Sequence, residues 1–165
     1  MIHLAYCNGN IHNNAMNDIK NQVQIVLVET SHPGNIGSVA RAMKTMGLQN
    51  LVLVKPRNFP SKEAFVLSGN AQDLIEQAVV VNTLDEAIKN CTNIYATSAR
   101  TRSISWPIIT AEMAGIEINK SVREGTKVSI IFGREDRGLT NEELQKANKH
   151  ILIPSSEDYP VLNIA

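Results

Sequence analysis

The sequence predicts an α/β domain with a mostly parallel sheet and helices on both faces of that sheet. Apolar, β-branched runs recur along the chain, and such runs are typical of strands buried on both faces. Segments with helical spacing separate these runs through short connections, as in parallel α/β folds. The 165 residues, 43% of them hydrophobic, suffice to bury one ordinary core, which favours a single domain.

The first strand–helix–strand unit is the clearest one in the chain. Residues 22–29 (QVQIVLVE) predict a buried strand, and the Ser-His-Pro-Gly sequence after it interrupts that strand. Asn35 is a favourable helix N-cap, and apolar residues recur at helical spacing from Ile36 until Gly47 ends the helix. Residues 51–54 (LVLV) predict the second strand. Such a unit predicts parallel strands joined by a right-handed crossover.

The same pattern continues to the end of the chain. Further strands are expected at 79–81, 93–97, 127–132 and 150–153. Further helices are expected at 61–68, 71–77, 83–89 and 140–146, and in the later part of 106–123 after a loop. Thr140 and Glu143 form a capping box at the start of the last helix. Residues 22–165 are expected to fold as this domain, whereas 1–21, which begin Asn-rich and without apolar periodicity, are expected to be a disordered extension.

Composition argues against several functional classes. Sixteen basic and sixteen acidic side chains cancel, so any RNA contact must come from a local basic patch. Two cysteines, without a CxxC motif or a Cys/His cluster, argue against a disulfide framework and a zinc site, so no metal is expected. No apolar run approaches the length of a membrane span, and the start lacks the features of a signal peptide. We therefore expect no membrane association and a cytoplasmic location.

Ligands bind parallel α/β sheets at the loops that follow the carboxyl ends of the strands, and three such loops have unusual composition here. The first contains Gly34 and Gly37 in the spacing GxxGxxA rather than GxGxxG, and the second strand ends at Lys55 rather than at a ribose-binding acid. The second loop, 132–140, nearly matches a phosphate-binding P-loop, but Leu139 replaces the lysine and two acids lie within it. Binding of a dinucleotide or a nucleoside triphosphate is therefore disfavoured.

The residues alone leave alternatives open in each loop. Arg41 lies on a polar helix face, which fits either a solvated surface or a functional cation. The four charges between the glycines of the second loop fit either a tight surface turn or a functional loop. The stretch 97–103 lies close to Trp106 in the sequence, and fits either a solvated loop or arginines that grip phosphate beside a base-stacking ring. The composition of the third loop, 153–163, predicts a loop and indicates no particular function.

Taken together, the three loops resemble the motifs of the SpoU family of RNA 2′-O-ribose methyltransferases, within the knotted SPOUT superfamily. The resemblance covers residues 23–165. The motifs occur here in the family's order, as NIGS at 35–38 followed by Ala40-Arg41, IFGRE at 131–135 with Gly138-Leu139, and Ile153-Pro154 leading to Leu162-Asn163. Residues 28–32 (VETSH) and 97–100 (TSAR) are similar to the TrmJ-type branch, which methylates a ribose in the tRNA anticodon loop.

The resemblance implies an α/β trefoil knot, a homodimer, and S-adenosyl-L-methionine as methyl donor with S-adenosyl-L-homocysteine as product. In the family the cofactor is held largely by main-chain groups of the knotted loops. The cofactor-binding positions implied here are Thr97, Ser98, Ala99, Gly133, Ile153, Pro160, Val161 and Leu162. The implied substrate is tRNA, methylated at nucleotide 32, a cytidine or uridine. The alternatives are methylation of rRNA, or a catalytically weak fragment that binds the cofactor or RNA.

The resemblance also implies roles for individual side chains. The arginine matching Arg41 lies beside the ribose 2′-hydroxyl in the family. Because a guanidinium stays protonated, we expect Arg41 to clamp the adjoining phosphate and stabilise the developing alkoxide rather than act as a base. Asn35 and Asn163 are expected to orient Arg41 or the ribose, and Glu135 to hold an arginine or the loop, or to accept the proton. The expected RNA contacts are Arg41, Lys44, Lys55, Arg57, Arg100, Arg102, Arg134 and Arg137.

Two features depart from the family pattern. A serine usually precedes the Leu-Asn pair of the third motif, where this chain has Val161. The chain ends at Ala165, whereas the family continues into a helix threaded through the knot, so this helix is expected to be truncated. We therefore expect the 165-residue chain to bind S-adenosylmethionine weakly and to methylate poorly, compared with a form extended past Ala165.

Overall fold

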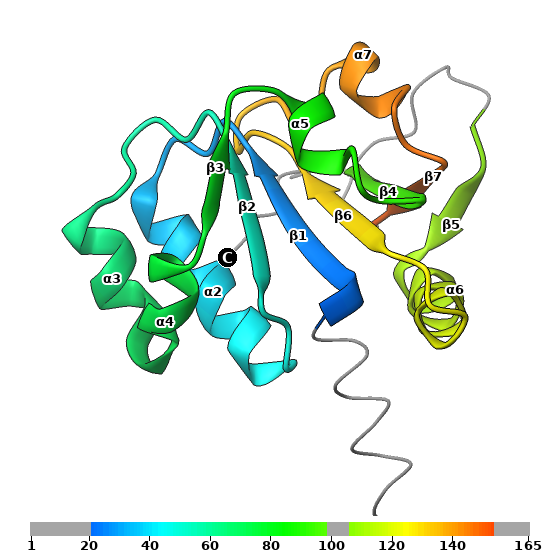
Figure 1. Cartoon of the computed structure of the whole chain (residues 1–165). Coiled ribbons are helices and arrows are strands. Elements are labelled where there is room, and N and C mark those ends of the chain that lie inside the picture. The colour runs from blue at the N-terminus through cyan, green and yellow to red at the C-terminus, as the bar shows by residue number, and fades with distance from the viewer. Residues whose placement is uncertain (1–20, 99–105, 154–165) are drawn as a thin grey trace, which may run out of the picture.

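The computed structural model describes residues 21–98 and 106–153, and these contain one sheet of seven parallel strands (Figure 1). The strands follow the order β3-β2-β1-β6-β4-β7-β5 across the sheet, and each neighbouring pair runs parallel. Their bounds are β1 Val23–Val28, β2 Asn50–Val54, β3 Val79–Val81, β4 Asn93–Ser98, β5 Ile108–Thr110, β6 Val128–Phe132 and β7 Lys149–Leu152.

Helices cover both faces of this sheet. Ile25 and Leu27 of β1 share a core cluster with residues of α2, α3 and α4, whereas Val26 and Val28 share one with residues of α5 and α7. Successive residues of a strand point to opposite faces, so the two clusters lie on opposite sides of the sheet. A third cluster packs α6 against β4, β5, β6 and β7. The helices are α2 Pro33–Thr45, α3 Lys62–Ser68, α4 Gln72–Glu76, α5 Leu84–Ile88, α6 Ala111–Arg123 and α7 Asn141–Leu144, with a 3₁₀ turn at Gly69–Ala71.

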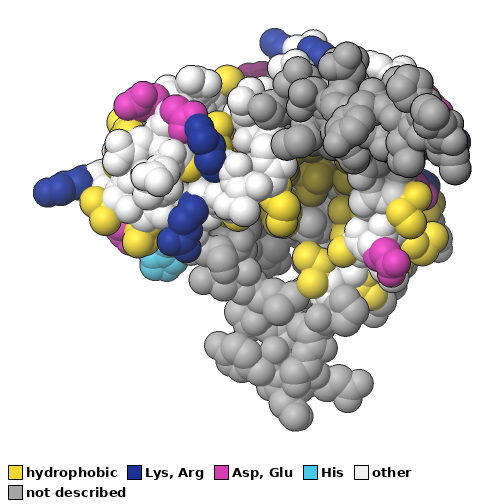
Figure 2. Space-filling view, turned by 90° about the horizontal axis from the view of Figure 1, so that it is seen from below, with side chains coloured by type: hydrophobic (Ala, Val, Ile, Leu, Met, Phe, Trp, Pro, Cys, Tyr) yellow, Lys and Arg dark blue, Asp and Glu magenta, His cyan; other side chains and the backbone are white. Residues whose placement is uncertain are grey.

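Between α2 and α6 the sheet face is incompletely covered by the described residues. Leu48, which follows α2, and Ile130 on β6 are partly buried and pack against both the α2 cluster and the α6 cluster. Seen from below, hydrophobic side chains line a hollow between the two sides of the molecule (Figure 2). The apolar core of this face is therefore continuous from one helix to the other, but still partly exposed where the two clusters meet.

The predicted α/β class is confirmed, and each predicted strand lies within one residue of an observed strand at both ends. The short strand β5 was not predicted, because three residues next to a proline are too few to show a periodic pattern. The prediction that Asn35 caps the first helix is wrong. The helix begins at Pro33 with His32 as N-cap, because the fixed φ and missing N–H of proline suit the first helical position.

Two further predictions fall wholly or mainly on parts of the chain that are not described. The predicted trefoil knot depends on residues after Ile153, and the first 20 residues of the predicted N-terminal extension also lie outside the described residues. Within residues 21–98 and 106–153, no helix is long and apolar enough to cross a membrane. The same residues contain no group of three or more His, Cys, Asp or Glu side chains that could hold a metal ion.

The glycines of the first loop bring α2 close to α3. A Cβ atom on Gly37 would lie 2.3 Å from the main-chain oxygen of Ala64, closer than real Cβ atoms approach. A Cβ atom on Gly34 would lie 2.7 Å from a side-chain carbon of Leu67. The glycine spacing that partly matches a dinucleotide fingerprint therefore serves the contact between two helices. It also fixes α2 firmly against α3 along its first two turns.

Candidate active site

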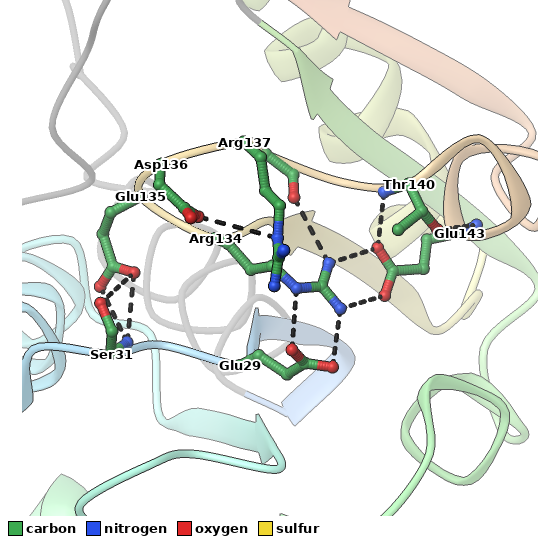
Figure 3. Close-up of polar contacts among 9 residues, drawn as sticks. Glu29, Ser31, Arg134, Glu135, Asp136, Arg137, Thr140 and Glu143 are labelled. Carbon is green, nitrogen blue, oxygen red and sulfur yellow. Dashed lines mark hydrogen bonds and ion pairs between the residues drawn. The ribbon is translucent and has the colours of Figure 1, made fainter.

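The first two motif loops lie next to each other at one edge of the sheet. β1 and β6 are neighbouring parallel strands, and Leu27 near the end of β1 is level with Phe132 at the end of β6. The segments that leave these two strands therefore start side by side. One leads through Ser31 into α2, and the other is the charged loop between Gly133 and Gly138 (Figure 3). This is the edge where parallel α/β sheets place their ligand sites.

Glu135 links the second loop to the start of α2. Its carboxylate accepts hydrogen bonds from the Ser31 main-chain N–H at 3.2 Å, the Ser31 hydroxyl at 3.0 Å and the Asn35 side-chain amide at 2.9 Å. The helix α2 has no acidic residue in its first turn and no side-chain cap from His32. A negative charge at a helix N-terminus is favourable, so Glu135 supplies from about a hundred residues away what the local sequence lacks.

The surroundings of Glu135 keep it ionised. Burial favours the neutral form, but the hydrogen bonds from Asn35 and Ser31 outweigh burial, and the pKa of Glu135 lies below its ordinary value. A carboxylate with a lowered pKa is a weak proton acceptor at neutral pH. Its hydrogen bonds to Ser31 and Asn35 occupy the carboxylate, so of the two roles expected for Glu135 we favour holding the loop over accepting the proton.

Arg134 is the centre of a second link, and its guanidinium is fully occupied. A guanidinium has five N–H donors. Two of them meet the Glu29 carboxylate, at 2.9 and 2.7 Å, and two meet the Glu143 carboxylate, at 2.9 and 3.0 Å. The fifth points to the main-chain oxygen of Gly138 at 3.4 Å (Figure 3). Arg134 thus joins the end of β1, its own loop and the start of α7.

The burial and the internal contacts of Arg134 argue against the expectation that it contacts RNA. Only 9% of its surface is exposed, and each of its donors already has an acceptor within the described residues. An RNA phosphate would have to displace a carboxylate that is held on two oxygens, which is the strongest arrangement open to an arginine. We therefore expect Arg134 to hold the site together rather than to contact RNA.

The other cations expected to contact RNA are exposed where they are described. Arg41 is exposed on α2, about two turns beyond Asn35, and its main-chain oxygen accepts a hydrogen bond from the Thr45 hydroxyl. Lys44 forms an ion pair with Asp73 at 2.5 Å, so its charge is partly balanced within the protein. Three more are exposed in segments that follow β2 and β6, namely Lys55, Arg57 and Arg137. Arg100 and Arg102 lie outside the described residues.

Four of the expected cofactor positions lie together. Thr97 and Ser98 end β4, Gly133 follows β6, and Ile153 follows β7, and these three strands are neighbours in the sheet. The Thr97 hydroxyl donates to the main-chain oxygen of Ile131 at 3.0 Å, and the Ile153 N–H donates to that of Ser98 at 3.1 Å. The remaining expected site residues, Ala99, Pro160, Val161, Leu162 and Asn163, lie outside the described residues.

A model of the SpoU rRNA Methylase family matches residues 22–165, which is most of the chain. The chain belongs to the SpoU rRNA Methylase family. The resemblance to the SpoU family is thereby confirmed, and the two loops described here contact each other through Glu135.

Similar proteins place the chain more closely within the SpoU family. It is 50% identical over 145 residues to a protein of Sodalis glossinidius named tRNA (cytidine/uridine-2'-O-)-methyltransferase TrmJ, covering 87% of this chain and 56% of that one. A solved structure from Haemophilus influenzae Rd KW20, ascribed to the methylase family, superposes with a TM-score of 0.80 at 44% identity, covering 86% and 59%. TrmJ from Z. mobilis ZM4 superposes with a TM-score of 0.79 at 34% identity, covering 86% and 62%. The chain spans about half the length of the curated relatives it matches.

Sequence reasoning missed Glu29 and recognised only part of the role of Glu143. Glu143 was identified as the capping-box partner of Thr140, and the structure confirms that box. The same carboxylate also binds Arg134, which the capping pattern does not reveal. Glu29 lies about a hundred positions before its partner and has a left-handed backbone, with φ at 49°, which no local sequence signal predicts. One signal could have pointed to this contact. An arginine in the second motif loop, Arg134, needs acidic partners, and candidates for them lie elsewhere in the sequence.

Acidification is expected to weaken the fold through the Arg134 cluster. The hydrogen bond from Arg134 lowers the pKa of Glu29 below its ordinary value of 4.5. The stabilisation from this lowered pKa is therefore fully present above that value and is lost as the pH falls below it. Glu29→Gln is expected to lower the free energy of unfolding by about 1–2 kcal/mol at neutral pH, and by progressively less as the pH falls below 4.5. Urea denaturation at a series of pH values measures the stability loss at neutral pH and its decrease in acid.

A matched control is Glu124→Gln at the exposed C-cap of α6. Glu124 lies 4.0 Å from Lys120, and both side chains are well exposed, so this change is expected to alter stability by no more than about 0.5 kcal/mol at any pH. A Glu29→Gln effect on stability that did not shrink at any pH below 4.5 would contradict the ionic role of Glu29.

Proposed function

We propose that this chain is the catalytic domain of an S-adenosylmethionine-dependent tRNA 2′-O-ribose methyltransferase that acts at nucleotide 32, a cytidine or uridine. Family membership and the relatives named TrmJ support a methyltransferase of tRNA. The observation that carries the proposal is the pairing of the first two motif loops, in which Glu135 binds Asn35 at the carboxyl edge of the sheet. This pairing places the helix that carries Arg41 beside the loop that carries Gly133.

The described residues fit a cofactor held mainly by main-chain groups. Thr97, Ser98, Gly133 and Ile153 lie at the ends of three neighbouring strands, and none of them has an ionisable side chain. Main-chain N–H and C=O groups at these four positions suit the adenine and amino-acid ends of S-adenosylmethionine. The bound cofactor supplies an electrophilic methyl group on a sulfonium.

The chain's own residues supply position and charge. Bound S-adenosylmethionine would supply the methyl group, and the ribose 2′-oxygen that receives it would release its proton to solvent. Arg41 is exposed and stays protonated, so it is suited to bind the neighbouring phosphate and to stabilise negative charge on that oxygen. Asn35 is fixed by Glu135 about two turns before Arg41, and this contact holds the start of α2 in place.

The RNA surface proposed here is a set of exposed cations at the same edge. Lys55 and Arg57 follow β2, and Arg137 lies in the second motif loop. A local patch of this kind reconciles RNA binding with a net charge of zero. We place the protein in the cytoplasm as a homodimer, in which two such patches act on one tRNA.

The test is methyl transfer from labelled S-adenosylmethionine to tRNA, followed by mapping of the label. Label is expected on the 2′-oxygen of nucleotide 32, and a tRNA with a 2′-deoxyribose at that position is expected to take up none. Because the family description names rRNA, ribosomal RNA is the second candidate and serves as the competing substrate. Label on rRNA alone would assign the enzyme to that substrate instead.

Calorimetric titration with S-adenosylhomocysteine tests the cofactor site separately. It is run on the 165-residue chain and on a chimera in which Ala165 is followed by the residues that come after the matched segment in the Sodalis relative. Binding of one molecule per subunit by either form supports the site. Binding without methyl transfer by either form would leave the weaker alternative, a binding domain without catalysis, and absence of binding in both forms would overturn the proposal.

A further inference from the structure

We propose that the Glu29–Arg134 contact is a positioning device, which holds the loop 133–138 in register with the helix that carries Arg41. The inference rests on the proposed function, and it adds two residues, Glu29 and Arg134, to the machinery of the reaction. Neither is expected to touch substrate or cofactor. Both are expected to act through the loop that follows β6.

The first step is that two adjacent residues of this loop reach to two different places. The side chain of Arg134 binds Glu29 at the end of β1, whereas Glu135 binds Ser31 and Asn35 at the start of α2. Arg134 therefore donates hydrogen bonds to the segment that follows β1, and the next residue, Glu135, accepts hydrogen bonds from that segment and from α2. Two such contacts, of opposite sense and side by side, fix both the distance and the rotation of the loop relative to α2 (Figure 3).

The second step is that α2 is the fixed partner and the loop is the part being placed. Gly37 packs against the main chain of α3 with no space for a methyl group, so α2 cannot shift without disturbing α3. The loop has fewer supports of its own. Arg134 and Gly138 exchange main-chain hydrogen bonds of 3.2 and 2.8 Å, and a glycine in left-handed conformation, with φ at 69°, completes the turn.

The third step is that Arg134 is suited to this task and a lysine would not be. Its planar guanidinium contacts Glu29, Glu143 and its own loop at the same time. A lysine ammonium is a compact point charge and cannot hold both carboxylates in this fork geometry. Burial of Arg134, with 9% of its surface exposed, means that these contacts are weakly screened and well defined in direction.

The experiment combines amide hydrogen exchange with steady-state kinetics on Glu29→Gln, Arg134→Lys and the control Glu124→Gln. In Glu29→Gln, the amides of Arg134 and Gly138 are expected to exchange at least tenfold faster, relative to the amides of β6. Glu29 lies 105 positions from Arg134 in the chain, so this readout is not local. A purely global loss of stability would instead speed the exchange of β6 as much as that of the loop.

In the same variants, kcat at saturating tRNA and cofactor is expected to fall at least tenfold, with the KM for tRNA within twofold of wild type. Arg134→Lys is expected to show the same pattern, and Glu124→Gln to match wild type in both measurements.

Unchanged relative exchange in Glu29→Gln would overturn the proposal whether or not the protein is a methyltransferase. Faster exchange with unchanged kcat would also overturn it. If neither the wild-type chain nor its extended form transfers methyl groups, the proposed function fails, while the exchange data still decide whether Glu29 holds the loop.

Discussion

Arg41→Ala is expected to reduce kcat for methyl transfer about 10²–10³-fold, the range seen when one group that stabilises a developing oxyanion is removed. Arg41 is exposed on α2, and its side chain lies outside the three core clusters. Its removal is therefore expected to change the free energy of unfolding by no more than about 0.5 kcal/mol. Single-turnover methylation of tRNA and urea denaturation, measured on the same preparations, separate the two effects.

Arg123→Ala is the matched control for this change. Arg123 is also an exposed arginine in a 13-residue helix, but it ends α6 rather than lying beside the motif loops. It is expected to leave kcat unchanged, because loss of one surface cation far from the site removes no contact with the ribose. The role of Arg41 would be refuted by an Arg41→Ala enzyme that retains the wild-type kcat, or by an equal loss of kcat in both variants.

Affinity for S-adenosylhomocysteine distinguishes a clamp on the RNA from a cofactor contact. The cofactor positions described here end β4, β6 and β7, whereas Arg41 lies on α2. Arg41→Ala is therefore expected to bind S-adenosylhomocysteine as wild type does. A loss of that affinity, parallel to the loss of kcat, would instead place Arg41 at the cofactor.

The elements of the fold were predictable because their signals are local. The apolar runs of β1, β2 and β6 are buried on both faces, and a run of this kind needs no distant information to identify it. The capping box of Thr140 and Glu143 is likewise complete within four residues. The strand β5 was not predicted, because its three residues gain their structure from pairing with β7, which is a long-range contact.

The site was predictable only where a family motif marked it. Asn35, Arg41 and Glu135 were identified through the resemblance, and the structure brings Asn35 and Glu135 into direct contact. Arg134 and Arg137 show the limit of this reasoning, since they lie three positions apart in one loop. Arg134 is buried between two carboxylates, whereas Arg137 is exposed and lies 3.9 Å from Asp136. Composition cannot separate them, because the difference is made by Glu29, which reaches Arg134 only in the folded chain.

Gly133→Ala is expected to show the largest effect on the cofactor side of the site. A Cβ atom at this position would lie 2.3 Å from the carbonyl carbon of Gly138 and 2.4 Å from the nitrogen of Leu139. Both atoms belong to the main chain, so the clash cannot be relieved by turning a side chain and must open the loop. Overpacking of this kind is expected to lower the free energy of unfolding by about 1–3 kcal/mol.

The same opening is expected to weaken S-adenosylhomocysteine binding about tenfold or more, which corresponds to roughly 1.4 kcal/mol of lost binding energy. Denaturant unfolding and calorimetric titration measure the two effects on wild type and variant. Gly115→Ala is the matched control, because a Cβ atom there meets no atom within 4 Å and the residue lies inside the helix α6. This control is expected to raise stability by about 0.5–1 kcal/mol, since alanine is the better residue in a helix interior. The two substitutions add the same methyl group. Stability changes of opposite sign would therefore show that the close main-chain approach at Gly133, and not the loss of a glycine as such, causes the effect.

If Gly133→Ala proved as stable as wild type and bound S-adenosylhomocysteine equally well, the loop would have to be looser than its main-chain contacts indicate.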